Sequence, residues 1–300
     1  MQRMSGGTSG GRNAVLRALR SAFERASASY DANAVLHTQV RVELLERLDV
    51  LAFTPATVLD LGAGTGQATR ALRERYRRAR VLALDLAPGM LAAARARQSW
   101  LRPFDRVCAD GTRLPLREGS IELVFSSLML QWAVDLDAVL AEARRVLAPR
   151  GCFTFATFGP DTLHELRAAW RAADAFGHVN DFVDMHALGD ALVRAGFADP
   201  VMDVDRHRLS YPSAAALMRD LKLVGTHNVA AGRPAGLTGR ARLARVEAAY
   251  AAMRLPDGRL PATCEVIYGQ AWCPGGKPPL RARRGEVTVD VGAIARRPPR

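Results

Sequence analysis

The sequence has few of the residues from which metal sites, disulfides and membrane spans are built. Its 300 residues include four cysteines and six histidines, with neither a C-x-x-C pair nor an H-x-x-x-H pair. This scarcity argues against a zinc site or a disulfide framework and favours a reducing cytoplasm. No stretch approaches the roughly 18 consecutive apolar residues that span a bilayer, and the first twenty residues lack the apolar core of a secretory signal. We therefore expect a cytoplasmic protein with no metal and no membrane association.

Positive charge is plentiful but unevenly distributed. The net charge is +12, and lysine supplies only Lys222 and Lys277 among the 42 basic residues. Residues 1–20 carry four arginines and no acid, and residues 275–300 carry seven basic against two acidic residues. The body of the chain is therefore much closer to neutral. Because a basic stripe interleaved with aromatics, as single-strand binders use, is absent, the charge favours an acidic partner over nucleic acid.

Short apolar runs alternate with amphipathic helical windows between residues 57 and 158. The runs are TVLDLG, RVLALDLA, RVCADG, IELVFSSL and GCFTFATFG. Such alternation predicts βαβ units with right-handed crossovers and a sheet covered on both faces. Later in the chain, VMDVDRHRLSYP and PATCEVIYGQAWCP read as further strands, the last of them antiparallel. We expect an α/β, Rossmann-like fold with a mostly parallel, seven-stranded sheet and an antiparallel last strand.

The predicted elements divide the chain into three parts. We expect residues 1–22 to be a disordered or flexible N-terminus, residues 23–274 to form one domain, and residues 275–300 to be a basic, flexible tail. Helical windows within 212–260 form an insertion between the last two strands, which is large enough to cover a substrate. Another helix is expected over 161–175, where Thr162 and Glu165 have the spacing of a capping box.

A glycine loop follows the first predicted strand. It reads Asp60-Leu61-Gly62-Ala63-Gly64-Thr65-Gly66. A tight strand-to-helix turn requires glycine where φ is positive or where a ligand presses on the backbone. The G-x-G-x-G spacing, with an acid two residues before the first glycine, differs from the G-x-G-x-x-G of dinucleotide folds, whose helix end holds a pyrophosphate. The loop therefore favours a cofactor without phosphates.

Two acids downstream complete the cofactor pattern. Asp85 ends the next strand, where a carboxylate can accept hydrogen bonds from both ribose hydroxyls. Asp110 follows the third strand, where it can meet an adenine amino group. Each also has a simpler interpretation, Asp85 as a helix cap and Asp110 as a turn residue. The combination resembles the class I S-adenosylmethionine-dependent methyltransferases, and the resemblance implies a cofactor site made of Asp60, Gly62, Ala63, Gly64, Gly66, Asp85, Leu86, Asp110 and Gly111.

A narrower resemblance covers about residues 23–272. The segments that carry it are ASASYDANAVLHTQVRVELLERL, FSSLMLQWAVDL, GPDTLHELRAAW, LGDALVRAGFADPVMDVDRHRLSYP, LMRDLKLVGTHN, GLTGRARLARVEAAY and RLPATCEVIYGQAW. They are similar to the malonyl-acyl-carrier-protein O-methyltransferases of biotin synthesis. The resemblance makes residues 23–274 a methyltransferase domain, and it implies methylation of the free carboxylate of a malonyl thioester on the acidic acyl carrier protein. A carboxylate with a pKa near 4 is already ionised at neutral pH, so positioning and desolvation are needed rather than an acid, a base or a metal.

Several side chains are candidates for positioning the acceptor. Tyr30 lies in the segment that, in the family, folds over the site. Gln131 and Trp132 follow the fourth strand, on the edge where α/β proteins bind ligands. Both aromatics can also be read as packing residues. The insertion supplies three candidate partners for the substrate carboxylate, although a solvated helix face is the more ordinary role for any one of them: Lys222, Arg219 and His227.

Two other functions remain open from the sequence. DTLHELR, LVRAGF, LPAT and ARRGEVTV also resemble a methyltransferase-like group that hydroxylates a protein arginine in the assembly of respiratory complex I. Against this alternative, the insertion reads more like the biotin family, and the first segment, although acid-free and arginine-bearing, is a poor transit peptide. The remaining hypothesis is a non-catalytic module that binds S-adenosylmethionine, against which the intact loop and Asp85 argue.

Overall fold

The computed structural model describes residues 9–51, 53–224 and 239–275. Within them, seven strands form one sheet in the order β3-β2-β1-β4-β5-β7-β6. The strands are β1 (Thr57–Leu61), β2 (Arg80–Asp85), β3 (Asp105–Cys108), β4 (Ile121–Ser127), β5 (Leu147–Phe158), β6 (Ala198–Tyr211) and β7 (Leu260–Trp272). Strands β1 to β5 pair in parallel, and β7 is antiparallel to both of its neighbours, β5 and β6. The predicted α/β fold with a mostly parallel sheet and an antiparallel last strand is confirmed.

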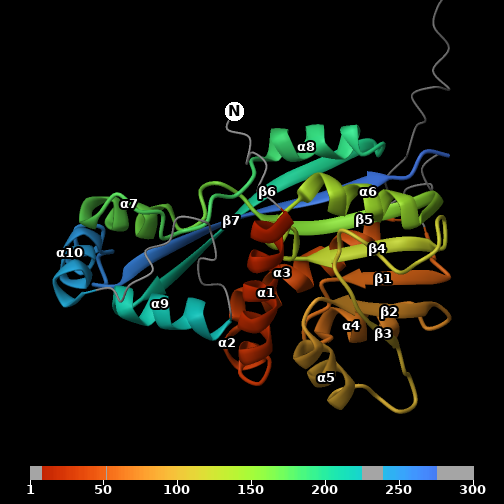
Figure 1. Ribbon diagram of the computed structural model, residues 1–300, viewed down its shortest axis with the longest axis horizontal. Coiled ribbons are helices and arrows are strands. Elements are labelled where there is room, and N and C mark those ends of the chain that lie inside the picture. The colour runs from red at the N-terminus through yellow and green to blue at the C-terminus, as the bar shows by residue number, and fades with distance from the viewer. Residues whose placement is uncertain (1–8, 52, 225–238, 276–300) are drawn as a thin grey trace, which may run out of the picture.

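Helices pack on both faces of this sheet (Figure 1). The longer ones are α1 (Ser9–Ala26), α3 (Val35–Glu46), α4 (Gln67–Arg75), α5 (Pro88–Ala96), α6 (Leu136–Val146), α7 (His164–Ala173), α8 (Met185–Arg194), α9 (Ala214–Leu223) and α10 (Arg240–Ala251). The shorter ones are α2 (Tyr30–Asn33), η1 (Arg47–Val50) and η2 (Leu130–Trp132). One buried cluster joins the sheet to α3, α4 and α5, and a second joins it to α6 and α8. Among the described residues, no helix has the length and apolar character needed to cross a membrane.

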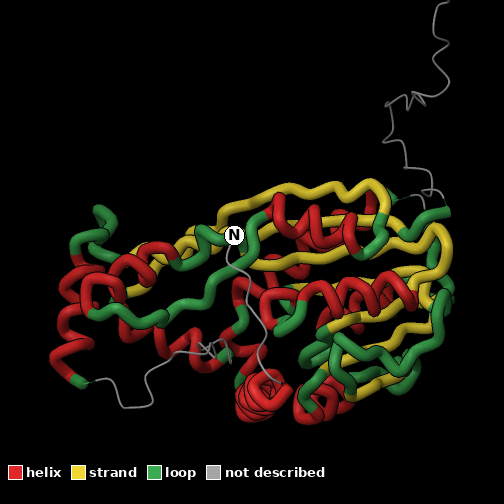
Figure 2. The backbone as a smooth tube through the Cα atoms, turned by 45° about the horizontal axis from the view of Figure 1, so that its top comes forward, coloured by secondary structure: helices red, strands yellow, loops and turns green. Residues whose placement is uncertain are grey.

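The last two strands are long and carry the insertion beyond the rest of the sheet. Their pairing runs from Ala198 opposite Trp272 to Tyr211 opposite Leu260. Helices α7, α9 and α10 gather around the extended part of β6 and β7 (Figure 1), and the tube view shows the same division between a strand-rich side and a helical side (Figure 2). Helices α9 and α10 belong to the predicted insertion at 212–260, whose residues 225–238, including His227, lie outside the described residues.

The structure corrects two local expectations. Residues 9–22, expected to belong to a flexible N-terminus, form most of helix α1, because Leu19, Ala22 and Ala26 give it a buried face against α5. The expected capping box is wrong as well. The Thr162 hydroxyl donates to the Glu265 carbonyl at 2.9 Å and the Glu165 carboxylate accepts from the Thr263 backbone and side chain, so both residues join α7 to β7. Residues 1–8 and 276–300 lie outside the described part of the chain.

Candidate active site

The glycine loop connects β1 to α4 at the carboxyl edge of the sheet. The backbone amides of Gly62 and Ala63 both donate to the Leu84 carbonyl, at 2.8 and 2.9 Å, which fixes the loop against the end of β2. The Thr65 hydroxyl donates to the Asp31 carboxylate at 2.6 Å, and Asp31 also pairs with Arg97 at 3.0 Å. The loop is therefore held from both sides, by the sheet and by α2.

The three glycines of the loop all have positive φ, but they face different surroundings. A Cβ on Gly62 would clash with the Met129 side chain, and one on Gly66 would lie 2.7 Å from the Cβ of Ala94 in α5. These two positions are packed closely. Gly64, with φ of +54°, would meet nothing within 4 Å, so its missing side chain leaves open space at the pocket, where a ligand can approach the backbone.

Asp85 lies at the end of β2, next to the loop. Its carboxylate accepts hydrogen bonds from the backbone amides of Gly64 and Ala87, both at 2.8 Å. Burial raises the pKa of Asp85, while these backbone hydrogen bonds act in the opposite direction. Each carboxylate oxygen can accept more than one hydrogen bond, so Asp85 can hold the loop and still bind a pair of hydroxyl groups.

Asp60 occupies a different position from the one the sequence suggested. It is buried behind the loop, where its carboxylate accepts a 2.5 Å hydrogen bond from the Thr69 hydroxyl of α4. Burial raises the pKa of Asp60 to about 7; the Thr69 hydrogen bond lowers it, the Asp85 charge raises it and the Arg41 charge lowers it. Asp60 therefore acts on the loop from within the core and does not face the pocket.

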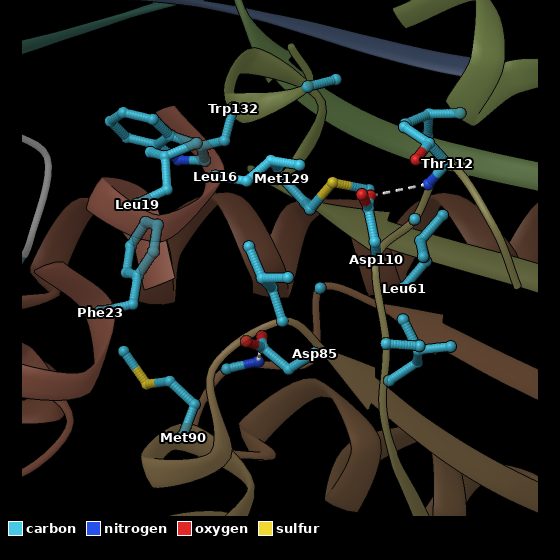
Figure 3. Close-up of a pocket in the computed structure, with 18 of the residues that line it drawn as sticks. Leu16, Leu19, Phe23, Leu61, Asp85, Met90, Asp110, Thr112, Met129 and Trp132 are labelled. Carbon is cyan, nitrogen blue, oxygen red and sulfur yellow. Dashed lines mark hydrogen bonds between the residues drawn. The ribbon is translucent and has the colours of Figure 1, made fainter. Parts of the chain in front are cut away.

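A pocket opens between the glycine loop, the ends of β2 and β4, and helix α1. Figure 3 shows Leu16, Leu19 and Phe23 of α1 on one side, with Asp110 and Thr112 opposite them. Arg12 extends from α1 to the far side, where its guanidinium donates to the Thr112 hydroxyl at 2.8 Å and lies 3.4 Å from Asp135. Helix α1 is therefore a cover over this pocket, fastened across it by Arg12.

The predicted cofactor residues divide into two groups. Those that line this pocket are Gly62, Gly64, Asp85, Leu86, Asp110 and Gly111. Asp60, Ala63 and Gly66 do not line the pocket and contribute to the conformation of the loop instead. Asp110 lines the pocket and also accepts a hydrogen bond from the Thr112 amide at 2.9 Å, so it combines the predicted position with the simpler turn role.

A second, larger pocket of about 930 Å³ adjoins the first. Its volume is at the upper end of the range of small-molecule sites. Apolar side chains from α3, α7, β6 and α9 dominate its lining, with Phe158, Trp170 and Phe182 among the aromatics. Trp132 lines both pockets, so the two spaces meet at this side chain.

The junction between the pockets is built by aromatic residues from separate elements. Tyr30 lines the first pocket and His37 the second, and their rings lie 5.6 Å apart, centroid to centroid. The His37 ring lies 6.4 Å from Phe158, and Trp132 packs edge-on against Phe23 at 5.5 Å. Burial, followed by the Asp85 and Asp31 charges, raises the pKa of Tyr30, whereas burial and Arg41 lower that of His37 to about 4. Both groups are neutral at pH 7.

The acceptor candidates are not all brought together. Tyr30 and Trp132 both line the first pocket. Gln131 lines neither pocket; its amide donates to the Leu128 carbonyl at 2.7 Å and accepts from Thr157. Lys222 lines the second pocket with an exposed side chain, and Arg219, also exposed, does not line it.

Sequence reasoning missed His37 and the cover formed by α1. The spacing of Leu16, Leu19 and Phe23 is the helical signal that could have revealed α1 as an amphipathic helix. No sequence signal identifies His37.

Within the described residues, Glu43, Asp205 and His207 lie close enough together to hold a metal ion, but they line neither pocket, and Glu43 already accepts from the Tyr268 hydroxyl at 2.6 Å.

Comparisons with known proteins agree with this geometry. A family described as a methyltransferase domain matches residues 59–155, the segment that contains the glycine loop, Asp85 and Asp110. A malonyl-[acyl-carrier protein] O-methyltransferase of Halorhodospira halophila is 52% identical over 282 residues, covering 94% of this chain and 96% of the relative. One from Laribacter hongkongensis is 53% identical over 280 residues, covering 91% and 94%. These matches extend through the insertion, and they give no support to the arginine hydroxylase alternative.

Solved structures with low sequence identity share the fold. The YcgJ protein of Bacillus subtilis superposes with a TM-score of 0.57 at 14% identity, covering 79% of this chain and 99% of its own. Phosphoethanolamine N-methyltransferase 2 of Haemonchus contortus, solved with S-adenosylmethionine, gives a TM-score of 0.51 at 16% identity, covering 84% of this chain and 57% of its own. At these identities the likeness concerns the class I methyltransferase fold alone.

Proposed function

The chain belongs to the malonyl-[acyl-carrier protein] O-methyltransferase family, and from this premise we propose that it methylates the free carboxylate of a malonyl group carried on acyl carrier protein. S-adenosylmethionine is the methyl donor, and the reaction is an early step of biotin synthesis. The structural observation that supports the proposal is the meeting of two pockets at Trp132. A glycine-loop pocket and a larger, mostly apolar pocket share one side chain, as a donor site and an acceptor site must.

The residues of the first pocket fit S-adenosylmethionine. Gly64 leaves open space where a Cβ would otherwise stand, and Asp85 offers carboxylate oxygens at the same end of the pocket. We assign Asp85 to the ribose hydroxyls and the Asp110–Gly111 turn to the adenine side. The apolar side chains Leu86 and Met90 line the same pocket and suit the flat faces of a purine.

The bound cofactor supplies an electrophilic methyl group: a carboxylate oxygen bonds to the methyl carbon, the methyl–sulfur bond breaks, and opposite charges are neutralised without a proton transfer. The work left to the protein is to orient the carboxylate, hold it in line and remove water from it. Leu16, Leu19 and Phe23 of α1 cover the first pocket with apolar surface. Water exclusion by α1 strengthens the attraction between the carboxylate and the cationic donor, since charges interact more strongly at low dielectric.

The opening of the second pocket carries the charge that an acidic carrier protein requires. Arg25, Lys222 and Arg259 line this pocket, and all three are exposed. One acid, Asp220, also lines the pocket, so the three cations leave a positive balance that attracts an acidic partner and orients it as it approaches. We place the carrier at this opening, with its acylated arm in the apolar interior, so Lys222 serves docking rather than contact with the reacting carboxylate.

Mass spectrometry of the carrier protein tests the proposal. Malonyl carrier protein incubated with the purified enzyme and S-adenosylmethionine should gain the mass of one methyl group, and acetyl carrier protein, which has no free carboxylate, should gain none. Absence of the gain in a preparation that binds the cofactor would refute the enzymatic function and leave a cofactor-binding module. The four cysteines are all free thiols, which fits the reducing cytoplasm we propose for this reaction.

A further inference from the structure

The junction between the two pockets contains three neutral hydrogen-bond donors that have no partner. They are the Tyr30 hydroxyl, the His37 imidazole and the Trp132 indole N–H, and none forms a hydrogen bond with another residue in the described ranges. All three side chains are partly buried. Because these three side chains line the pockets and their donors are not taken up by neighbouring residues, they are available to a ligand with several acceptor oxygens.

From this geometry we infer that His37 binds the carboxylate of the acyl substrate at the junction, as a neutral donor that acts together with Tyr30 and Trp132. The inference rests on the proposed function, because it assigns one residue to the carboxylate that the enzyme methylates. Nothing in the sequence pattern marked His37, which lies in the first turn of α3. It faces the acceptor pocket, while its ring contacts Tyr30, a lining residue of the donor pocket.

Neutrality of the donors suits this reaction. A cation at the junction would repel the positive sulfonium of the donor, and it would hold the carboxylate's negative charge and so oppose its attack on the methyl carbon. His37 stays uncharged because burial and the Arg41 guanidinium lower its pKa to about 4. Arg41 itself lines neither pocket. A neutral imidazole has one N–H donor, which can orient the carboxylate without forming an ion pair.

Two substitutions separate hydrogen bonding from packing. His37→Phe keeps an aromatic ring beside Tyr30 and Phe158 but removes the donor, and His37→Gln keeps a donor but removes the ring. If His37 binds the carboxylate, kcat/KM for malonyl carrier protein should fall roughly 10- to 150-fold in His37→Phe, the range expected for a hydrogen bond to a charged group. His37→Gln should retain most of the activity. A packing role predicts the opposite order.

Gln39→Ala is the matched control, because Gln39 is exposed on the same helix and lines neither pocket. Cofactor affinity by calorimetry and the thermal midpoint should stay close to wild type in all three variants. Acetyl carrier protein, which lacks the carboxylate, should inhibit wild type and His37→Phe with the same Ki. A folded His37→Phe enzyme with kcat/KM within twofold of wild type would overturn the assignment, as would a larger loss in His37→Gln. If wild type itself forms no methyl ester, the proposed function fails instead.

Discussion

The carboxylate of Asp85 should control cofactor affinity far more than it controls folding. It accepts two 2.8 Å hydrogen bonds from the amides of Gly64 and Ala87 and lines the first pocket. Asp85→Ala removes the carboxylate that we assign to the two ribose hydroxyls. Hydrogen bonds to a charged group contribute about 1.5–3 kcal/mol each. Water can replace part of this hydrogen bonding in the variant. We therefore expect the binding free energy to weaken by about 2–4 kcal/mol, which raises Kd roughly 30- to 1000-fold.

The effect of the same substitution on stability should be smaller. Burial raises the pKa of Asp85, so the folded protein holds this carboxylate at a desolvation cost that the alanine variant no longer bears. Two backbone amides lose their acceptor, but Gly64 lines the pocket, where water can replace the carboxylate, so the cost falls mainly on the Ala87 amide, at about 1–3 kcal/mol. The variant should therefore remain folded.

Calorimetric titration with S-adenosylmethionine, together with urea unfolding, measures both effects. Asp105→Ala is the control, because Asp105 is an exposed acid of β3 whose 2.6 Å pair with Arg80 lies on the surface, where such pairs contribute about 0–1 kcal/mol. The control should bind the cofactor like wild type. A Kd for folded Asp85→Ala within threefold of wild type would refute the assignment of this carboxylate to the ribose.

Two further substitutions test the loop. Burial raises the pKa of Asp60 to about 7, above its value of about 4 in the unfolded chain. The stability that this group contributes is therefore full below about pH 4 and is lost as pH rises through 7. Asp60→Asn removes this pH dependence of stability. Its unfolding free energy relative to wild type should therefore rise by about 1–3 kcal/mol from pH 5 to pH 8. If urea titrations give the same difference between variant and wild type at both pH values, this prediction is wrong. Gly64→Ala and Gly119→Ala both place alanine at positive φ with no atom within 4 Å, so each should lose about 1–2 kcal/mol of stability. Only Gly64→Ala should weaken cofactor binding by calorimetry, and equal affinities would show that Gly64 does not face the cofactor.

The parts of the site that sequence predicted are those encoded by close neighbours in the chain. The positive φ of Gly62, Gly64 and Gly66 is a local property, and the position of Asp85 follows from the end of an apolar run. The alternation of apolar runs and helices likewise determined the parallel sheet, because each element must bury one face. Similar local reasoning failed at Thr162 and Glu165, where the capping spacing was present but partners on β7 bind both side chains.

The sequence by itself determined the fold and the cofactor loop, while tertiary packing decided the composition of the junction. Tyr30, His37, Trp132 and Phe158 come from four separate elements, and Gln131, adjacent to Trp132, lines neither pocket because its amide bonds to Leu128. The physical reason is the separation along the chain between the residues that set each feature. A turn or a strand is set by backbone sterics and periodicity over a few residues, whereas a cavity is what remains after distant elements have packed, and no local pattern records which side chains will line it.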